Sequence, residues 1–136
     1  MRVFFIVCSI MIFSAASKAS CPNINQINNY SSELEESLSE LVETIYIHFP
    51  RRFNFYDLAV RAESDAKFLE FSTRSGLIKC SMAKRIFSGL DISFNILRNH
   101  ILRFQRRRPY YYSIYESQWL ESKERFNHLL IEVNEN

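Results

Sequence analysis

The residues best suited to chemistry gather around a break between two amphipathic segments. His48, Arg51, Arg52, Asp57 and Arg61 all fall in the short stretch 48–61, on either side of a proline. Guanidinium groups form bidentate hydrogen bonds with carboxylates, and small ligands bind where a few such groups converge. The cluster predicts a site for a small dicarboxylate ligand. The alternative is that these charges only solvate a loop.

A second group of cations forms a basic run, Arg98–Arg108, which includes His100 and is followed by three tyrosines at 110–112. Cations beside aromatic rings also occur in nucleic-acid-binding proteins. We do not expect nucleic acid as a partner, because acids elsewhere balance the charge and the chain carries an export signal. The run predicts either a polyanionic surface or acidic protein as partner, or a solvated helix end with the acidic segment 33–43 as its neighbour.

Other kinds of chemistry find little support in the sequence. His48, His100 and His128 are far apart and form no His-x3-His or His-Glu-x2-His pattern. The chain has no Gly-x-Ser-x-Gly nucleophile elbow and no Cys-x2-Cys pair. We therefore expect no metal site, no cofactor and no hydrolase nucleophile.

The N-terminus predicts a signal peptide over residues 1–19. Arg2 supplies a positive start, Val3–Phe13 is an apolar run, and Ser17 and Ala19 put small residues at a cleavage site. The run is too short to span a bilayer comfortably. A lipoprotein signal fits less well, because Lys18 stands where such signals have an aliphatic residue. We expect export as a secreted or periplasmic protein, with residues 20–136 as a single helical domain and no membrane span.

Cleavage would also change the charge balance and the cysteine content. Arg2 and Lys18 leave with the leader, so the remaining cations equal the 15 acids. Of the three cysteines only Cys21 and Cys80 remain. In an oxidising compartment their pairing would stabilise the fold by about 4 kcal/mol, and the alternative is two free thiols.

The fold class predicted from composition and periodicity is all-α. Gly and Pro are scarce, which argues against turn-rich β architectures. Ser32 and Glu35 form a capping box, Pro50 ends the first helix, Gly76 caps the second and Pro109 stops the third. Residues 110–112 are expected to connect the last two helices. The expected helices are 32–49, 56–74, 81–105 and 113–133, in a compact bundle with one long central helix.

The apolar positions recur at steps of three and four along each helix, which predicts the buried faces. The expected inward residues are Leu34, Leu38, Leu41, Ile45, Phe49, Leu58, Ala62, Ala66, Leu69, Met82, Ile86, Leu90, Phe94, Leu97, Ile101, Phe104, Tyr115, Trp119, Phe126, Leu130 and Val133.

Over Leu34–Arg98 the chain resembles a secreted, periplasmic-type chorismate mutase. The resemblance rests on spacing: Phe55-Tyr56-Asp57 stands where the family has Ile-x-Asp, Ser75-Gly76-Leu77 where it often has Leu-Gly-Leu, and Arg85-Ile86-Phe87 begins the long third helix. Members of the family are exported, all-helical, single-domain enzymes that rearrange chorismate to prephenate. The resemblance implies this isomerase activity and an active site spread over three helices.

The family's site residues carry over to this chain in part. Its Asp falls on Asp57, its second-helix Arg is one position from Arg61, and its Lys falls on His48, for which Arg52 is a second substitute. The first-helix Arg and the third-helix Gln or Glu fall on Ser37 and Leu97. The rearrangement needs fixed charges that hold a dicarboxylate and stabilise the ether oxygen, so these positions bear directly on activity.

A non-catalytic class of function fits the same sequence. A secreted helical binding protein, such as an inhibitor, an immunity-type protein or an effector, would use its charged exterior to bind an acidic protein. The interior near His48, Asp57 and Arg61 discriminates the two: a polar pocket with convergent cations favours the enzyme, and a filled apolar core favours the binding protein.

Overall fold

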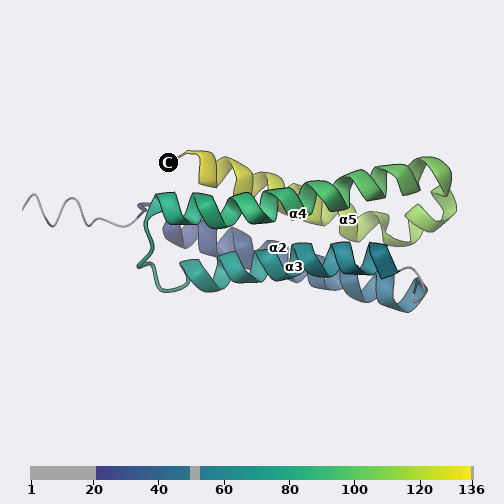
Figure 1. Ribbon diagram of the computed structural model, residues 1–136, viewed down its shortest axis with the longest axis horizontal. Coiled ribbons are helices and arrows are strands. Elements are labelled where there is room, and N and C mark those ends of the chain that lie inside the picture. The colour runs from purple at the N-terminus through teal and green to yellow at the C-terminus, as the bar shows by residue number, and fades with distance from the viewer. Residues whose placement is uncertain (1–20, 50–52, 136) are drawn as a thin grey trace, which may run out of the picture.

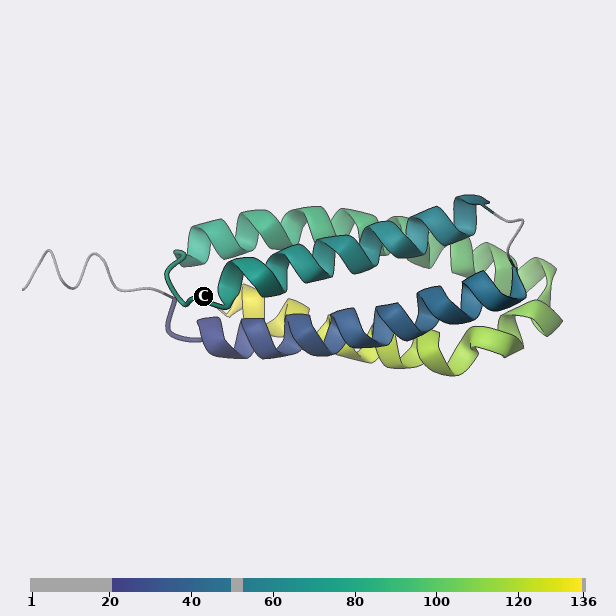
Figure 2. The same ribbon diagram turned by 90° about the horizontal axis from the view of Figure 1, so that it is seen from below.

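The protein is a four-helix bundle in a computed structural model that describes residues 21–49 and 53–135. The helices are α2 (Ile24–His48), α3 (Phe53–Thr73), α4 (Cys80–Arg107) and α5 (Pro109–Asn134). α2 packs against α3 and α5, and α4 packs against the same two helices, so α2 and α4 lie at opposite corners. Figure 1 shows α3 and α4 side by side along the length of the bundle, and Figure 2 shows the same helices from below. The predicted all-α bundle is confirmed.

Aliphatic side chains such as Leu34, Leu38 and Leu41 of α2 form one part of the core, and stacked aromatic rings form another. Phe94 of α4 lies nearly parallel to Phe126 of α5, with ring centroids 4.1 Å apart, and also stacks on Trp119. At one end of the bundle Phe55 contacts Tyr115 at 5.1 Å between centroids. Most predicted inward residues are buried; Leu58, Ile86 and Leu130 are half-buried, and Met82 is exposed.

Two predicted boundaries are wrong, each for a local reason. α2 begins at Ile24 rather than at residue 32, because Ile24 and Ile27 continue its buried stripe and outweigh the low helix propensity of the asparagines around them. Residues 110–112 are not a connector between the last two helices but belong to α5. Pro109 is the first residue of that helix, a position where the missing N–H costs nothing. Only Arg108 lies between α4 and α5.

The other two connections fall at the predicted breaks, although α3 begins at Phe53 rather than at residue 56. Gly76 follows α3 with φ of +68°, and its N–H donates to the carbonyl of Thr73 at 3.2 Å. α2 ends at His48, and the N–H of Phe49 donates to the carbonyl of Ile45 at 2.7 Å. Antiparallel helices with short connections therefore place the start of α3 beside the end of α4.

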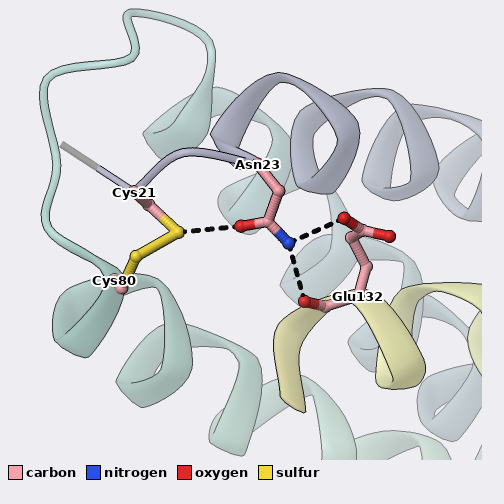
Figure 3. Close-up of a disulfide and its surroundings, with 4 residues drawn as sticks. All are labelled: Cys21, Asn23, Cys80 and Glu132. Carbon is pink, nitrogen blue, oxygen red and sulfur yellow. Dashed lines mark hydrogen bonds between the residues drawn. A yellow bond between two sulfur atoms is a disulfide. The ribbon is translucent and has the colours of Figure 1, made fainter. Parts of the chain in front are cut away.

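A disulfide joins Cys21 to Cys80 (Figure 3), at the end of the bundle where α2 and α4 begin. It ties the segment before α2 to the first residue of α4, and the Cα atoms are 4.7 Å apart, within the usual range. The side-chain amide of Asn23 donates to the backbone carbonyl and to Oε1 of Glu132, which fastens the same segment to α5. The predicted Cys21–Cys80 pairing is present in the structure.

Candidate functional site

The start of α3 and the second half of α4 enclose a hollow on the outside of the bundle. Its volume is about 550 Å³, and Asp57 and Arg61 of α3 line it together with Ile96, His100 and Arg103 of α4. Asp57 and Arg61 are one helical turn apart, which places both side chains on the same face of α3. The fold therefore joins part of the predicted dicarboxylate cluster to part of the basic run.

A second hollow of about 290 Å³ continues the first towards the end of α4. His100 and Arg103 line both hollows, and Phe104, Arg107 and Arg108 complete the second one. We call the surface formed by Asp57, Arg61, Ile96, His100, Arg103 and Arg107 the cationic groove. From the sequence, the cluster at 48–61 and the run at 98–108 were expected to form separate sites. This expectation is wrong, because antiparallel packing of α3 on α4 brings parts of both into one hollow.

Aromatic rings support the floor of the cationic groove. The imidazole of His100 stacks on Phe55 at 5.1 Å and on Phe104 at 5.9 Å between centroids. Behind them the interior is filled by Phe49 and Tyr115, both buried and both in contact with Phe55. The groove is thus an open exterior surface on a packed aromatic core rather than the mouth of an internal chamber.

The other predicted site residues are not in this groove or cannot be placed. His48 is exposed at the end of α2, its ring lies 6.4 Å from that of Phe49, and it lines neither hollow. Arg52 lies outside the described residues. Ser37, which stands at the position of the family's first-helix arginine, is buried and donates its hydroxyl hydrogen to the carbonyl of Leu34. Leu97 is buried in the core.

The charges of the bundle are separated between opposite corners. α2 carries five glutamates and no lysine or arginine, whereas α4 carries six lysines and arginines against Asp91 alone. The expectation that the acidic helix lies beside the cationic helix end is wrong, because α2 and α4 are diagonal. Ion pairs among the described residues include Arg74–Glu70, Arg125–Glu33 and Arg125–Glu121, and none of these three includes an arginine of the groove.

The contrast with Arg125 shows what a structural arginine does in this fold. Its guanidinium contacts Glu121 on its own helix at 2.7 Å and Glu33 of α2 at 3.2 Å, and so links α5 to α2. The hydrogen bond with Glu121 is the main cause that raises the pKa of Arg125. Arg61, Arg103 and Arg107 are exposed and have no comparable carboxylate partner among the described side chains.

Sequence reasoning identified the cations but missed that α3 and α4 share them. A usable signal exists, because residues equidistant from the turn of a helical hairpin face each other. Asp65 and Ser93 illustrate it: the Ser93 hydroxyl donates to the Asp65 carboxylate across the two helices. Counting outwards from this pair places Arg61 opposite residue 97 and Asp57 opposite residue 101. Ile96 and His100, each one position away, line the hollow together with Arg61 and Asp57.

Comparison with known proteins identifies no family for this chain. The chain matched no protein-family model, no curated protein and no solved structure. In the part of the chain that the structure describes, no helix is both long enough and apolar enough to cross a membrane. Across the same residues, no three histidine, cysteine or acidic side chains gather in a way that could hold a metal ion.

Proposed function

We propose that this protein is an exported, non-catalytic binding protein that takes an acidic segment of a partner protein into the cationic groove. The single observation that carries the proposal is the groove itself, in which Arg61, Arg103 and Arg107 are accompanied by one carboxylate, that of Asp57. Exposed arginines that lack an internal partner retain their capacity for bidentate pairing with carboxylates. A patch of this kind also speeds association with an acidic partner.

The form of the groove supports binding rather than catalysis. Electrostatic catalysis of a rearrangement depends on a preorganised site from which water is excluded. Here the arginines are exposed, and the space behind them is occupied by Phe55, Phe104 and Tyr115. An open surface with an apolar floor suits a peptide segment that carries both acidic and apolar side chains.

The compartment fits a protein of this kind. Disulfides persist in oxidising compartments and are rare in the cytosol, and the Cys21–Cys80 bond agrees with the export predicted from residues 1–19. The leader itself lies outside the described residues.

A chorismate mutase-like isomerase is the second candidate, and one observation favours it. Asp57, the residue that keeps the family's position, shares a hollow with three cationic or imidazole side chains, those of Arg61, His100 and Arg103. Such an arrangement could hold a small dicarboxylate. Conversion of chorismate to prephenate by the purified protein, lost in Arg61→Ala, would establish this candidate in place of the binding protein.

The proposed function is tested with a fluorescent oligoglutamate peptide and anisotropy at low ionic strength. Arg61→Ala and Arg103→Ala should each weaken binding by roughly tenfold, the scale of a hydrogen bond to a charged group. Arg85→Ala is the matched control, because it removes the same charge from an exposed α4 position outside the groove. An equal loss in all three variants, or no binding by the parent protein, would overturn the proposal.

A further inference from the structure

The outer face of α2 carries a stripe of acidic residues that ends in an exposed isoleucine. Glu36, Glu40, Glu43 and Ile47 follow each other at steps of four, three and four residues, so they lie on one face of the helix. All four are exposed, and 61% of Ile47 is accessible to solvent. We call these four residues the acidic stripe. None of its glutamates forms an ion pair with another described residue.

The α4 side of the cationic groove repeats this spacing in reverse order. Arg107, Arg103, His100 and Ile96 follow each other at steps of four, three and four residues when α4 is read from its C-terminal end. Ile96 is 41% accessible to solvent. A helix that runs antiparallel to α4 would meet three basic positions first and the isoleucine last. The acidic stripe presents its residues in the same order, three glutamates and then an isoleucine.

We propose that the cationic groove binds the acidic stripe of a second copy of this chain, with the two helices antiparallel. In this register Glu36 lies opposite Arg107, Glu40 opposite Arg103, Glu43 opposite His100 and Ile47 opposite Ile96. Both stripes extend over eleven residue steps, about 17 Å of helix at 1.5 Å per residue, so their lengths match. The inference rests on the proposed function, because it uses the same groove, and it names one acidic segment that fits there.

The position of the two surfaces in the bundle determines the symmetry of the complex. α2 and α4 lie at opposite corners, so one contact cannot bury the stripe and the groove of the same copy at once. The interface is therefore heterologous: each copy that inserts its stripe keeps its own groove open for the next copy. Assembly proceeds beyond the dimer as concentration rises, and it competes with any other acidic ligand for the groove.

The association is weak and sensitive to salt. Ion pairs between exposed side chains contribute little each and are screened within about 10 Å at 0.1 M salt. The apolar contact between Ile47 and Ile96 is the part of the interface that salt does not screen. We expect self-association at high protein concentration and low salt, and monomers when both conditions are reversed.

Sedimentation velocity of the oxidised protein over about a thousandfold range of concentration tests the inference. The parent protein should form dimers and larger species at low salt. Glu36→Lys/Glu40→Lys and Arg103→Glu/Arg107→Glu should each weaken association by roughly ten- to a hundredfold. Lys123→Glu, at an exposed α5 position outside both surfaces, is the control and should associate as the parent does. Monomers under all conditions would overturn the inference.

Mixing the two double variants gives a sharper test of the register. In the mixture the intact groove of the first variant meets the intact stripe of the second, and the reversed groove of the second meets the reversed stripe of the first. The two variants should therefore assemble in alternation, whereas each variant alone associates weakly. The quadruple variant with all four reversals in one chain should recover self-association, because both surfaces have exchanged sign. A mixture that stays monomeric would contradict the proposed pairing.

Failure of this inference is distinguishable from failure of the proposed function. Glu36→Lys/Glu40→Lys leaves the groove unchanged and should bind the oligoglutamate peptide at least as well as the parent protein. Peptide binding without self-association would overturn the inference and leave the proposed function standing. Loss of peptide binding in the parent protein would overturn both.

Discussion

Asp57 and Arg61 lie one helical turn apart on α3 and line the same hollow against α4. Asp57 is the single carboxylate among the residues that line the cationic groove, so it is the one group there that repels an anionic ligand. Its effect on the groove is opposite in the two candidate functions. A binding protein for acidic segments would bind more tightly without this charge, whereas an isomerase of the family that the chain resembles would lose a residue of its site.

Asp57→Asn should therefore strengthen the binding of oligoglutamate by about two- to fivefold, the scale of one exposed charge pair. The measurement is anisotropy at low salt, repeated at high salt, where the difference should shrink. Asp91→Asn removes a charge from α4 outside the groove and serves as the control. Weaker binding in Asp57→Asn, or loss of prephenate formation, would argue for the isomerase.

The two glycines of the chain should respond in opposite ways to alanine. Gly89 lies inside α4, and a Cβ there would meet nothing within 4 Å, so Gly89→Ala should stabilise the protein by about 0.5–1 kcal/mol. Gly76 has φ of +68°, a conformation that strains any other residue, so Gly76→Ala should destabilise it. Urea denaturation measures both. A destabilised Gly89→Ala would show that α4 does not run unbroken through this position.

Removal of the disulfide should lower thermal stability without changing the groove. Because the bond closes a loop of 59 residues, reduction should cost about 4 kcal/mol and lower the melting temperature by roughly 10 °C or more. The bond is attached to the first residue of α4, whereas the groove is lined by the second half of α4, so reduced protein that is still folded should bind oligoglutamate unchanged. Native protein whose two thiols both react quantitatively before reduction would contradict the bond.

Because of Glu63, the free energy of unfolding should decrease as pH rises in the acid range. Burial, and then the nearby Glu35 carboxylate, raise the pKa of Glu63 above its ordinary value of 4.5. The folded state therefore holds this proton more tightly than the unfolded chain, and the free energy of unfolding decreases as pH rises from the ordinary value through the raised one. Glu63→Gln should melt at a higher temperature than the parent at neutral pH. The difference between the two melting temperatures should become smaller towards pH 4. Glu35→Gln should give a smaller gain of the same sign, and equal melting of Glu63→Gln and parent at neutral pH would refute the prediction.

Local signals in the sequence were sufficient for most of the fold. The three-and-four spacing of Leu34, Leu38, Leu41 and Ile45 predicted the buried face of α2, because burial and helical geometry act on the same positions. The start of α2 was missed because Ile24 and Ile27 are separated from that run by polar residues of low helix propensity. Pro109 was misread because a proline that stops one helix is equally suited to begin the next.

The candidate site was harder to predict, because it depends on which helices are neighbours. The sequence identified Asp57, Arg61 and the basic run, but periodicity within single helices cannot show that α3 brings Arg61 to Arg103. The same gap led to the expectation that α2 neutralises α4, which its diagonal position excludes. The register across a helical hairpin, visible in the Asp65–Ser93 hydrogen bond, is the information that was lacking.

Backbone amide chemical shifts during titration with unlabelled oligoglutamate test the central claim most directly, because they locate the bound ligand. The account predicts shifts concentrated at residues 54–61 of α3 and 96–108 of α4, reduced in Arg103→Ala, with little change at residues 33–47 of α2. Shifts confined to other surfaces, or no shifts at peptide concentrations well above that of the protein, would contradict the assignment of the cationic groove as a binding site for acidic segments.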